Sequence, residues 1–173
     1  MKMRTLATFV KWLITPNREP DFLIGSTPED PYMRRWWVIP RNNWFNIYLH
    51  HMRHDDDDRA PHDHPWWSLS LCLDGDITEH QLIDNFNYDT TAMLAEDDRW
   101  WRVHHISKGQ WKWRNNKYTH RLELPNGDAW TMFITGPKVR TWGFHCPKGF
   151  VKWFDFVDKY NPGNPGRGCG EME

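Results

Sequence analysis

The feature that most constrains the fold is a series of short segments, from residue 44 onward, whose side chains alternate between two faces. The segments are rich in aromatic and β-branched residues, and most end at Gly, Asn, Asp or Pro. Many short strands at regular spacing, with no helices between them, are typical of an all-β sandwich or barrel. The predicted strands are residues 44–53, 66–73, 76–83, 99–106, 110–114, 118–124, 129–135 and 139–144.

The alternation is clearest from Tyr118 to Leu124. Tyr118, His120, Leu122 and Leu124 share one face of this predicted strand, because successive side chains point to opposite sides. His120 is therefore predicted to point inward with the leucines. Two turn signals, around Gly75 and at Asn126-Gly127, lie between apolar runs and predict hairpins.

The two ends of the chain differ from this pattern. Leu6, Phe9, Val10 and Leu13 have helical spacing, and six prolines and glycines make residues 15–43 look like loop. We therefore expect residues 1–43 to form a short N-terminal helix and a proline-rich arm packed on the barrel. The barrel itself is assigned to residues 44–160. The Gly- and Pro-rich residues 161–173 are predicted to form a flexible tail.

Composition excludes several classes of protein. Lys and Arg number 22 against 23 Asp and Glu, so a nucleic-acid partner or a polybasic membrane anchor is not expected. No apolar run approaches the length of about 18 residues needed to span a bilayer. Three widely spaced cysteines favour a reducing, cytoplasmic location without disulfides. The acidic run of residues 55–58 is expected to be a solvated loop.

The strongest chemical signal is the sequence His62-Asp63-His64. Residues i and i+2 of a strand project from one face, so the two imidazoles can converge on one point. Neutral imidazole is the commonest protein ligand for metals such as Zn, Cu, Fe and Ni. A third ligand is needed from another inward-facing strand, and His120 is the best candidate. The alternative is that the two histidines lie in a surface loop after the acidic run.

These residues resemble the two motifs of the cupin superfamily. In the first motif, His-x-His is followed after a set distance by Gly, here Gly75; in the second, His lies eleven residues after Gly, as His120 does after Gly109. The resemblance spans about residues 44–145. It implies a double-stranded β-helix barrel (a jelly roll) with a metal held by His62, His64 and His120, and a homodimer.

The sequence departs from the cupin pattern at the glutamate ligand of the first motif. Ser68 or Leu69 stands in its place, and neither binds a divalent ion well. A bulge near Pro65-Trp66 would turn Leu69, Leu71 and Leu73 inward together with the histidines, and we favour it. The predicted site is then a three-histidine one with open coordination positions. Asn115 and Asn116 replace the turn residues of the second motif and can still form a tight turn.

Further residues are candidates for the site. Glu79 is either a displaced fourth ligand or the partner of Arg102 or Arg114. Tyr118 could donate a proton, and His104 could act as a general acid or base; both could instead be packed side chains. Arg59 is the candidate for binding an anionic group of the ligand.

These features predict a metal-dependent enzyme that acts on a small-molecule ligand. The resemblance favours Fe²⁺, with Zn²⁺, Ni²⁺ or Mn²⁺ as alternatives, and an O₂-dependent dioxygenase reaction on a small polar molecule. One alternative is a metal-free, sugar isomerase- or epimerase-like cupin, with His62 as base and Tyr118 as acid. Another is a non-catalytic barrel that holds a small ligand against Trp66 or Trp111.

Overall fold

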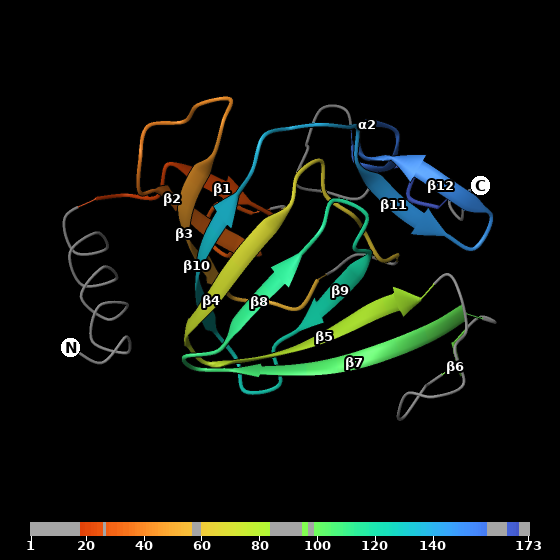
Figure 1. Ribbon diagram of the computed structural model, residues 1–173, viewed down its shortest axis with the longest axis horizontal. Helices are drawn as coiled ribbons and strands as arrows, with labels where there is room; N and C mark the ends of the chain where they lie inside the picture. Colours follow the sequence, from red (N-terminus) through yellow and green to blue (C-terminus); the bar gives the residue numbers. More distant parts are fainter. Residues whose placement is uncertain are drawn as a thin grey trace.

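The fold is all-β (Figure 1). A computed structural model describes residues 18–25, 27–56, 60–83, 95–96, 99–158 and 166–169 of the 173-residue chain. These residues form strands β1 (Phe22–Ile24), β2 (Met33–Trp37), β3 (Asn46–Met52), β4 (Ser68–Asp74), β5 (Asp76–Ile83), β6 (Ala95–Glu96), β7 (Arg99–Ser107), β8 (Trp111–Arg114), β9 (His120–Glu123), β10 (Ala129–Thr135), β11 (Gly143–Cys146) and β12 (Gly149–Lys152), and helix α2 (Trp153–Phe156).

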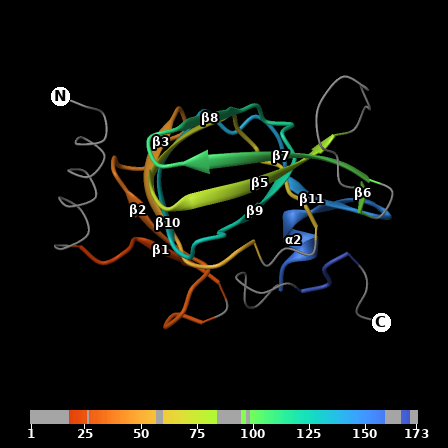
Figure 2. The ribbon, with the colours of Figure 1, turned by 90° about the horizontal axis from the view of Figure 1, so that it is seen from below.

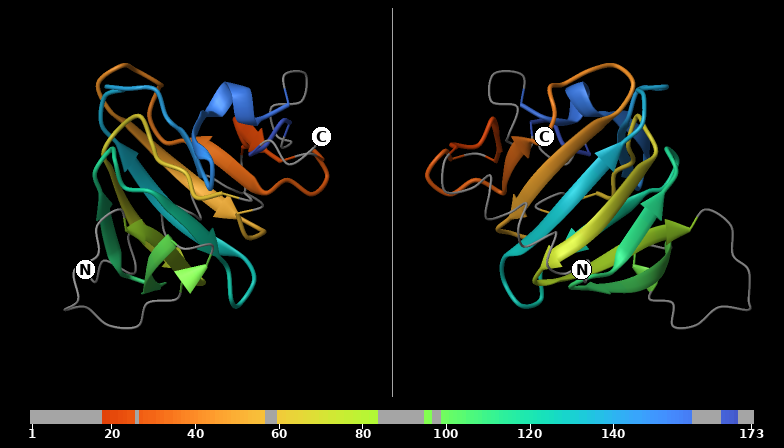
Figure 3. Two further views of the ribbon diagram at one scale, coloured as in Figure 1. Left: turned by 90° about the vertical axis from the view of Figure 1, so that its right-hand side faces the viewer. Right: turned by 60° about the vertical axis from the view of Figure 1, so that its left-hand side comes forward.

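The strands form two antiparallel sheets that face each other and a separate hairpin (Figures 1 and 2). The large sheet has the order β1-β2-β3-β10-β4-β8, and the small sheet has the order β6-β7-β5-β9. The hairpin of β11 and β12 lies beside the open end of the two sheets, together with α2 (Figure 3).

Three connections carry the chain from one sheet to the other at a sharp corner. β4 passes into β5 at Gly75, β7 into β8 at residues 108–110, and β9 into β10 at residues 124–128. Because β5 pairs with β7 and β9 while β4 pairs with β8 and β10, the same three-stranded ribbon belongs to both sheets. This bent ribbon gives the cupin-type barrel, so the fold class predicted from the sequence is confirmed.

The two predicted hairpin turns are corners instead. Gly75 has φ +77°, and a Cβ there would lie 2.4 Å from the carbonyl oxygen of Asp128. Gly127 also has positive φ, and its amide donates to Leu124 O at 3.2 Å. Both turns send the chain into the facing sheet rather than back along the same one, a difference that local turn residues do not encode.

An apolar core fills one end of the space between the sheets. Its buried members come from the large sheet (Met33, Met52, Cys72, Ala129) and from the small sheet and its corners (Ile77, Ile106, Leu124). Leu122 packs against this core. The predicted inward face of the His120 strand is therefore confirmed.

The bulge predicted near Pro65-Trp66 is wrong. β4 alternates regularly, with Cys72 in the inner core, while Leu71 and Leu73 pack with Trp36 and Leu49 on the outer face of the large sheet. The register of β4 against β10 shifts instead between Trp130 and Thr131. The prediction assumed that leucines need the inner face, whereas the outer face has an apolar cluster of its own.

The proline-rich arm is partly strand. β1 and β2 extend the large sheet, with β2 paired along β3 from Met33–Met52 to Trp37–Tyr48. The expectation of loop throughout residues 15–43 is therefore wrong for these two segments. The predicted N-terminal helix lies outside the described residues.

The predicted tail is also partly held in place. Cys169 forms a disulfide with Cys146 of β11, and the amides of Gly166 and Gly168 donate to Phe156 O at 2.9 and 3.0 Å. The expectation of a flexible tail is thus wrong for residues 166–169. The expectation of no disulfide is also wrong, because the fold brings two cysteines that are 23 residues apart in sequence to a Cα–Cα distance of 5.5 Å. The cytoplasmic location loses its cysteine argument and stays a prediction.

No helix within the described segments is long and apolar enough to cross a membrane.

Candidate metal centre

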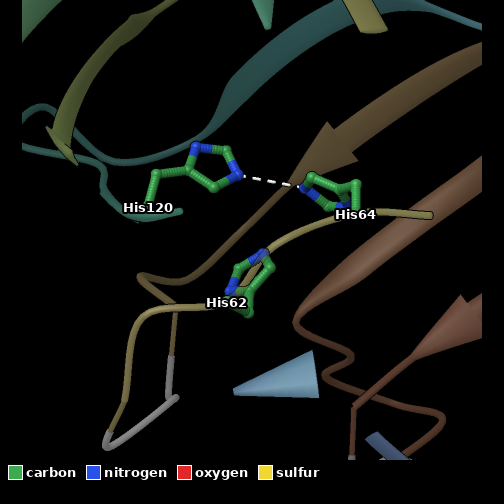
Figure 4. A group of neighbouring side chains, drawn as sticks. All are labelled: His62, His64 and His120. Carbon is green, nitrogen blue, oxygen red and sulfur yellow. Dashed lines mark hydrogen bonds between the residues drawn. The ribbon is translucent and has the colours of Figure 1, made fainter. Parts of the chain in front are cut away.

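Three histidines meet between the sheets. His62 and His64 lie on the segment that leads into β4, and His120 begins β9. One ring nitrogen from each lies within 4.8 Å of the others, and Nε2 of His64 is 3.0 Å from Nε2 of His120. Figure 4 shows the three rings pointing toward one another from two separate stretches of chain. The structure thus brings together the three residues that the cupin resemblance implies.

Backbone pairing brings His62 and His120 side by side. The amide of each residue donates to the carbonyl oxygen of the other at 2.9 Å, which makes an isolated antiparallel bridge. Directly opposed residues of an antiparallel pair carry their side chains on the same face. Main-chain hydrogen bonds therefore fix the spacing of two of the three rings.

Asp63 turns away from the rings and anchors the histidine segment from behind. Its carboxylate accepts hydrogen bonds from the Gly143 amide at 3.0 Å and from Arg140 at 2.6 Å, and it lies 3.1 Å from Nε2 of His145. His145 also contacts the hydroxyl of Thr119, next to His120, at 3.2 Å. One polar cluster thus supports both segments that supply the histidines.

Glu79 lies behind His120. Its Oε1 accepts hydrogen bonds from Nδ1 of His120 and from Nε of Arg114, each at 2.5 Å. Tyr118 donates to Oε2 at 3.0 Å, and Nζ of Lys112 is 3.4 Å from the same oxygen. Glu79 is fully buried and both of its oxygens are engaged. The structure therefore places Glu79 behind a candidate ligand rather than among the ligands, and Arg114 is its partner.

The charges in this network follow from burial and close pairing. Burial alone would raise the pKa of Glu79, but Arg114 and His120 hold it well below its usual range. Burial lowers the pKa of His120 to about 4, although the bond to Glu79 opposes this change. Burial, and then the neighbouring His62 and His120, hold the pKa of His64 well below its usual value. The imidazoles of His64 and His120 are neutral at pH 7.

The spacing of His64 and His120 fits two ligands of one divalent ion. Because the Nδ1 proton of neutral His120 is donated to Glu79, the lone pair on Nε2 points toward His64. Two nitrogen ligands about 2.1 Å from one ion and at right angles to each other would be about 3.0 Å apart. The observed separation of these two nitrogens is 3.0 Å.

Asp56 is a site residue that the sequence analysis missed. Its buried carboxylate lies 4.0 Å from Nδ1 of His62, and it accepts a hydrogen bond from the Leu122 amide at 2.7 Å and another from Tyr32. The acidic run was expected to be a solvated loop, which is wrong for this residue.

Of the other predicted site residues, Tyr118 lies directly beside His120, with ring centroids 5.6 Å apart. The Tyr118 hydroxyl is directed at Glu79, and burial, followed by that carboxylate's charge, raises the pKa of Tyr118. His104 lies opposite Glu79 on β7, and its Nε2 is 3.1 Å from the side-chain oxygen of Gln81. Arg59 lies outside the described residues.

No family model and no curated protein matches the chain. Among solved structures, an Fe(II) form of HppE is 13% identical with a TM-score of 0.49, and the match covers 70% of this chain and 58% of that one. The DMSP lyase DddQ from Ruegeria pomeroyi is 11% identical with a TM-score of 0.46, and the match covers 69% of this chain and 54% of that one. An uncharacterised Klebsiella pneumoniae protein with a double-stranded β-helix domain is 15% identical with a TM-score of 0.46, and the match covers 68% of this chain and 88% of that one.

This chain thus spans little more than half the length of HppE and DddQ. Similarity at this level concerns the arrangement of strands alone. The cupin-type fold rests on the chain's own sheet pairing and corners.

Proposed function

We propose that the chain binds one divalent metal ion through His62, His64 and His120, and that it catalyses an O₂-dependent oxidation of a small polar molecule. The observation that carries the proposal is the convergence of three imidazole nitrogens within 4.8 Å, with no carboxylate among them. Fe²⁺ is the favoured ion, and Zn²⁺, Ni²⁺ and Mn²⁺ are the alternatives.

An all-imidazole donor set leaves the ion with its full charge. When bound, such an ion supplies Lewis acidity and open coordination positions at which a small polar molecule and O₂ can be held.

The protein's own side chains hold this site in one protonation state. Glu79 keeps the Nδ1 proton on His120, so that Nε2 remains a ligand atom. Arg114 keeps Glu79 ionised. Tyr118 stays protonated and donates a hydrogen bond to the same carboxylate. Carboxylate–histidine–metal arrangements of this kind raise the basicity of the ligand and fix its orientation.

The two alternative functions receive less support from these contacts. In a metal-free isomerase, Tyr118 would have to give a proton to the substrate, whereas its hydroxyl is directed at Glu79. In a non-catalytic barrel, a tryptophan would hold the ligand. Trp66 does stack on His64 with ring centroids 6.3 Å apart, but Trp111 is exposed and on the opposite face of β8 from Lys112.

Elemental analysis of the purified chain, followed by O₂-uptake measurements after loading with Fe²⁺, tests the proposal. We expect one metal ion per chain in the wild type and loss of most of it in His64→Ala. His105→Ala is the matched control, because His105 is an exposed histidine on β7 whose ring contacts Thr78. Metal content equal in His64→Ala and wild type would contradict metal binding at this centre.

The oxidation is tested separately with small polar compounds as candidate substrates. Compound-dependent O₂ uptake by the Fe²⁺-loaded wild type, abolished by chelation, is the expected result. Turnover that survives removal of all metal would favour the isomerase alternative. Ligand binding that is unchanged in His64→Ala and lost in Trp66→Ala would favour the binding barrel.

A further inference from the structure

Near the metal centre, the carboxylates of Glu79 and Asp56 lie beside His120 and His62, and the cations come from Arg114, Lys112 and Arg35. Two cations, Arg114 and Lys112, face the single carboxylate of Glu79. Arg35 of β2 adds another positive charge on the same inner face, because it pairs across the sheet with His50. Unlike Arg114, it pairs with no carboxylate in the part of the chain that the structure describes.

The side chains that contact Arg35 in the described segments are uncharged. Its Nε donates to Nε2 of His50 at 2.9 Å, its Nη2 is 3.9 Å from the Met33 sulfur, and its guanidinium lies 5.0 Å from the Tyr48 ring centroid. His50 accepts this hydrogen bond as a neutral imidazole, since burial and then the charge of Arg35 hold its pKa well below the usual value. Among the described residues, no carboxylate lies within ion-pair distance of Arg35.

A short chain of ring contacts connects Arg35 to the metal centre. The His50 ring stacks on Phe133 with centroids 5.0 Å apart, and Phe133 meets the His64 ring edge-on at 6.4 Å. Tyr48 and Phe133 pair across β3 and β10, so both border the same stretch of the inner face. Phe133 thus contacts both the His50 ring, which accepts the hydrogen bond from Arg35, and the His64 ring of the metal centre, and the charge of Arg35 contributes to the lowered pKa of His64.

A partly buried cation without a counter-ion is costly, and an arginine presents a planar fork of N–H donors that matches an oxyanion. In Arg35 the Nε hydrogen is donated to His50, whereas no oxygen atom of the described residues accepts a hydrogen bond from the Nη groups. These are the donors that a carboxylate or phosphoryl group binds, often in a bidentate manner.

We propose that the small molecule taken by this site carries an oxyanion, a carboxylate or a phosphoryl group, and that the Nη donors of Arg35 bind it. The inference rests on the proposed function, because it places the anion beside the three histidines. It gives Arg35 the role that the sequence analysis assigned to Arg59.

Anion affinity in Arg35 variants tests this inference. The probes are sodium acetate and inorganic phosphate, titrated against chloride at equal ionic strength, with affinity measured by calorimetry. We expect Arg35→Met to weaken binding of the preferred probe at least about tenfold. Arg35→Lys, which keeps the charge without the planar fork, is expected to lie between wild type and Arg35→Met. The probe with the higher affinity shows whether the site prefers a carboxylate or a phosphoryl group.

Arg34→Met is the matched control. Arg34 is the preceding residue of β2, and it pairs with His51 on the outer face of the sheet. The Arg34→Met variant should bind both anions with the affinity of the wild type. Should Arg35→Met fail to fold, as judged by circular dichroism, Arg35→Gln and Arg35→Lys carry the comparison.

Running the titrations on metal-free and metal-loaded protein separates the two proposals. If the chain binds no metal, the difference between wild type and Arg35→Met still measures the anion site. Equal anion affinity in wild type and Arg35→Met, an equal loss in Arg34→Met, or affinity that requires the metal and ignores Arg35 would each overturn the inference.

Discussion

Nδ1 of His120 donates a hydrogen bond of 2.5 Å to Oε1 of Glu79, while Nε2 of the same ring lies 3.0 Å from Nε2 of His64. The two nitrogens of one imidazole therefore have different roles. One fixes the protonation state of the ring, and the other faces the candidate metal position.

Replacing Glu79 by Gln should weaken metal binding while keeping a hydrogen-bond acceptor behind His120. Loss of such an outer carboxylate typically costs 10- to 100-fold in metal affinity, so we expect about tenfold or more. The variant also leaves Arg114 without its buried counter-ion, and the free energy of unfolding should fall by about 3 kcal/mol. Chelator competition and urea unfolding measure the two effects. Wild-type affinity in a folded Glu79→Gln protein would disprove the role given to Glu79. Glu123→Gln is the control, because Glu123 is a partly exposed carboxylate whose histidine partner, His80, is not one of the three candidate ligands.

Tyr118→Phe should have a small effect on the metal. The phenol donates to Glu79 at 3.0 Å, and that carboxylate keeps Arg114 and His120 as partners. We expect the unfolding free energy to fall by about 1–2 kcal/mol and metal affinity to stay within about threefold of wild type. A fall of about 100-fold in turnover with unchanged metal content would show instead that Tyr118 transfers a proton to the substrate.

The corner at Gly75 should tolerate no side chain. An alanine there would combine positive φ with a contact of 2.4 Å to the Asp128 carbonyl, whereas the space around Gly127, also at positive φ, is open to 4 Å. Gly75→Ala should therefore lower the unfolding free energy by about 2 kcal/mol more than Gly127→Ala does. Equal urea midpoints for the two variants would contradict this account of the corner.

The three cysteines should react in a defined order. Cys72 is 1% exposed, and burial, then nearby Asp76, raise its pKa to about 11, so the native protein should show no reactive thiol at pH 8. Unfolding without reductant should reveal one thiol, and reduction should reveal all three. Three thiols in the unreduced, unfolded chain would show that Cys146 and Cys169 are not linked.

The disulfide should also contribute to stability. Its sequence separation of 23 residues corresponds to about 3 kcal/mol of loop entropy removed from the unfolded chain. Cys169→Ser should lose about that amount in thermal or urea unfolding, and adding Cys146→Ser should cost little more, because the link is already broken. Additive losses in the double variant would argue against the link.

Local pattern was enough to predict most of the strands. The alternation from residue 76 to 83 and from 129 to 135 gave β5 and β10 with the observed bounds, and the face of His120 followed from parity. The turn at Asn115 and Asn116 also formed as predicted, with the Lys117 amide donating to Oδ1 of Asn115 at 2.8 Å. These features depend on neighbours in sequence.

The features that sequence reasoning missed depend on distant residues. β2 lies between Pro31 and Pro40, whose turn signals outweighed the alternation of Met33, Arg35 and Trp37. The partners of Glu79 and Asp56 come from other strands, so neither their burial nor their position behind a histidine could be read from spacing. The homodimer and the absence of nucleic-acid and membrane partners stay predictions.

The corners at Gly75, residues 108–110 and residues 124–128 have a consequence for how molecules reach the histidines. At each corner the chain runs continuously from one sheet into the other, as β4–β5, β7–β8 and β9–β10. The two sheets therefore cannot move apart unless all three bends straighten together. We therefore expect the two sheets to keep their relative positions when a small molecule reaches the histidines.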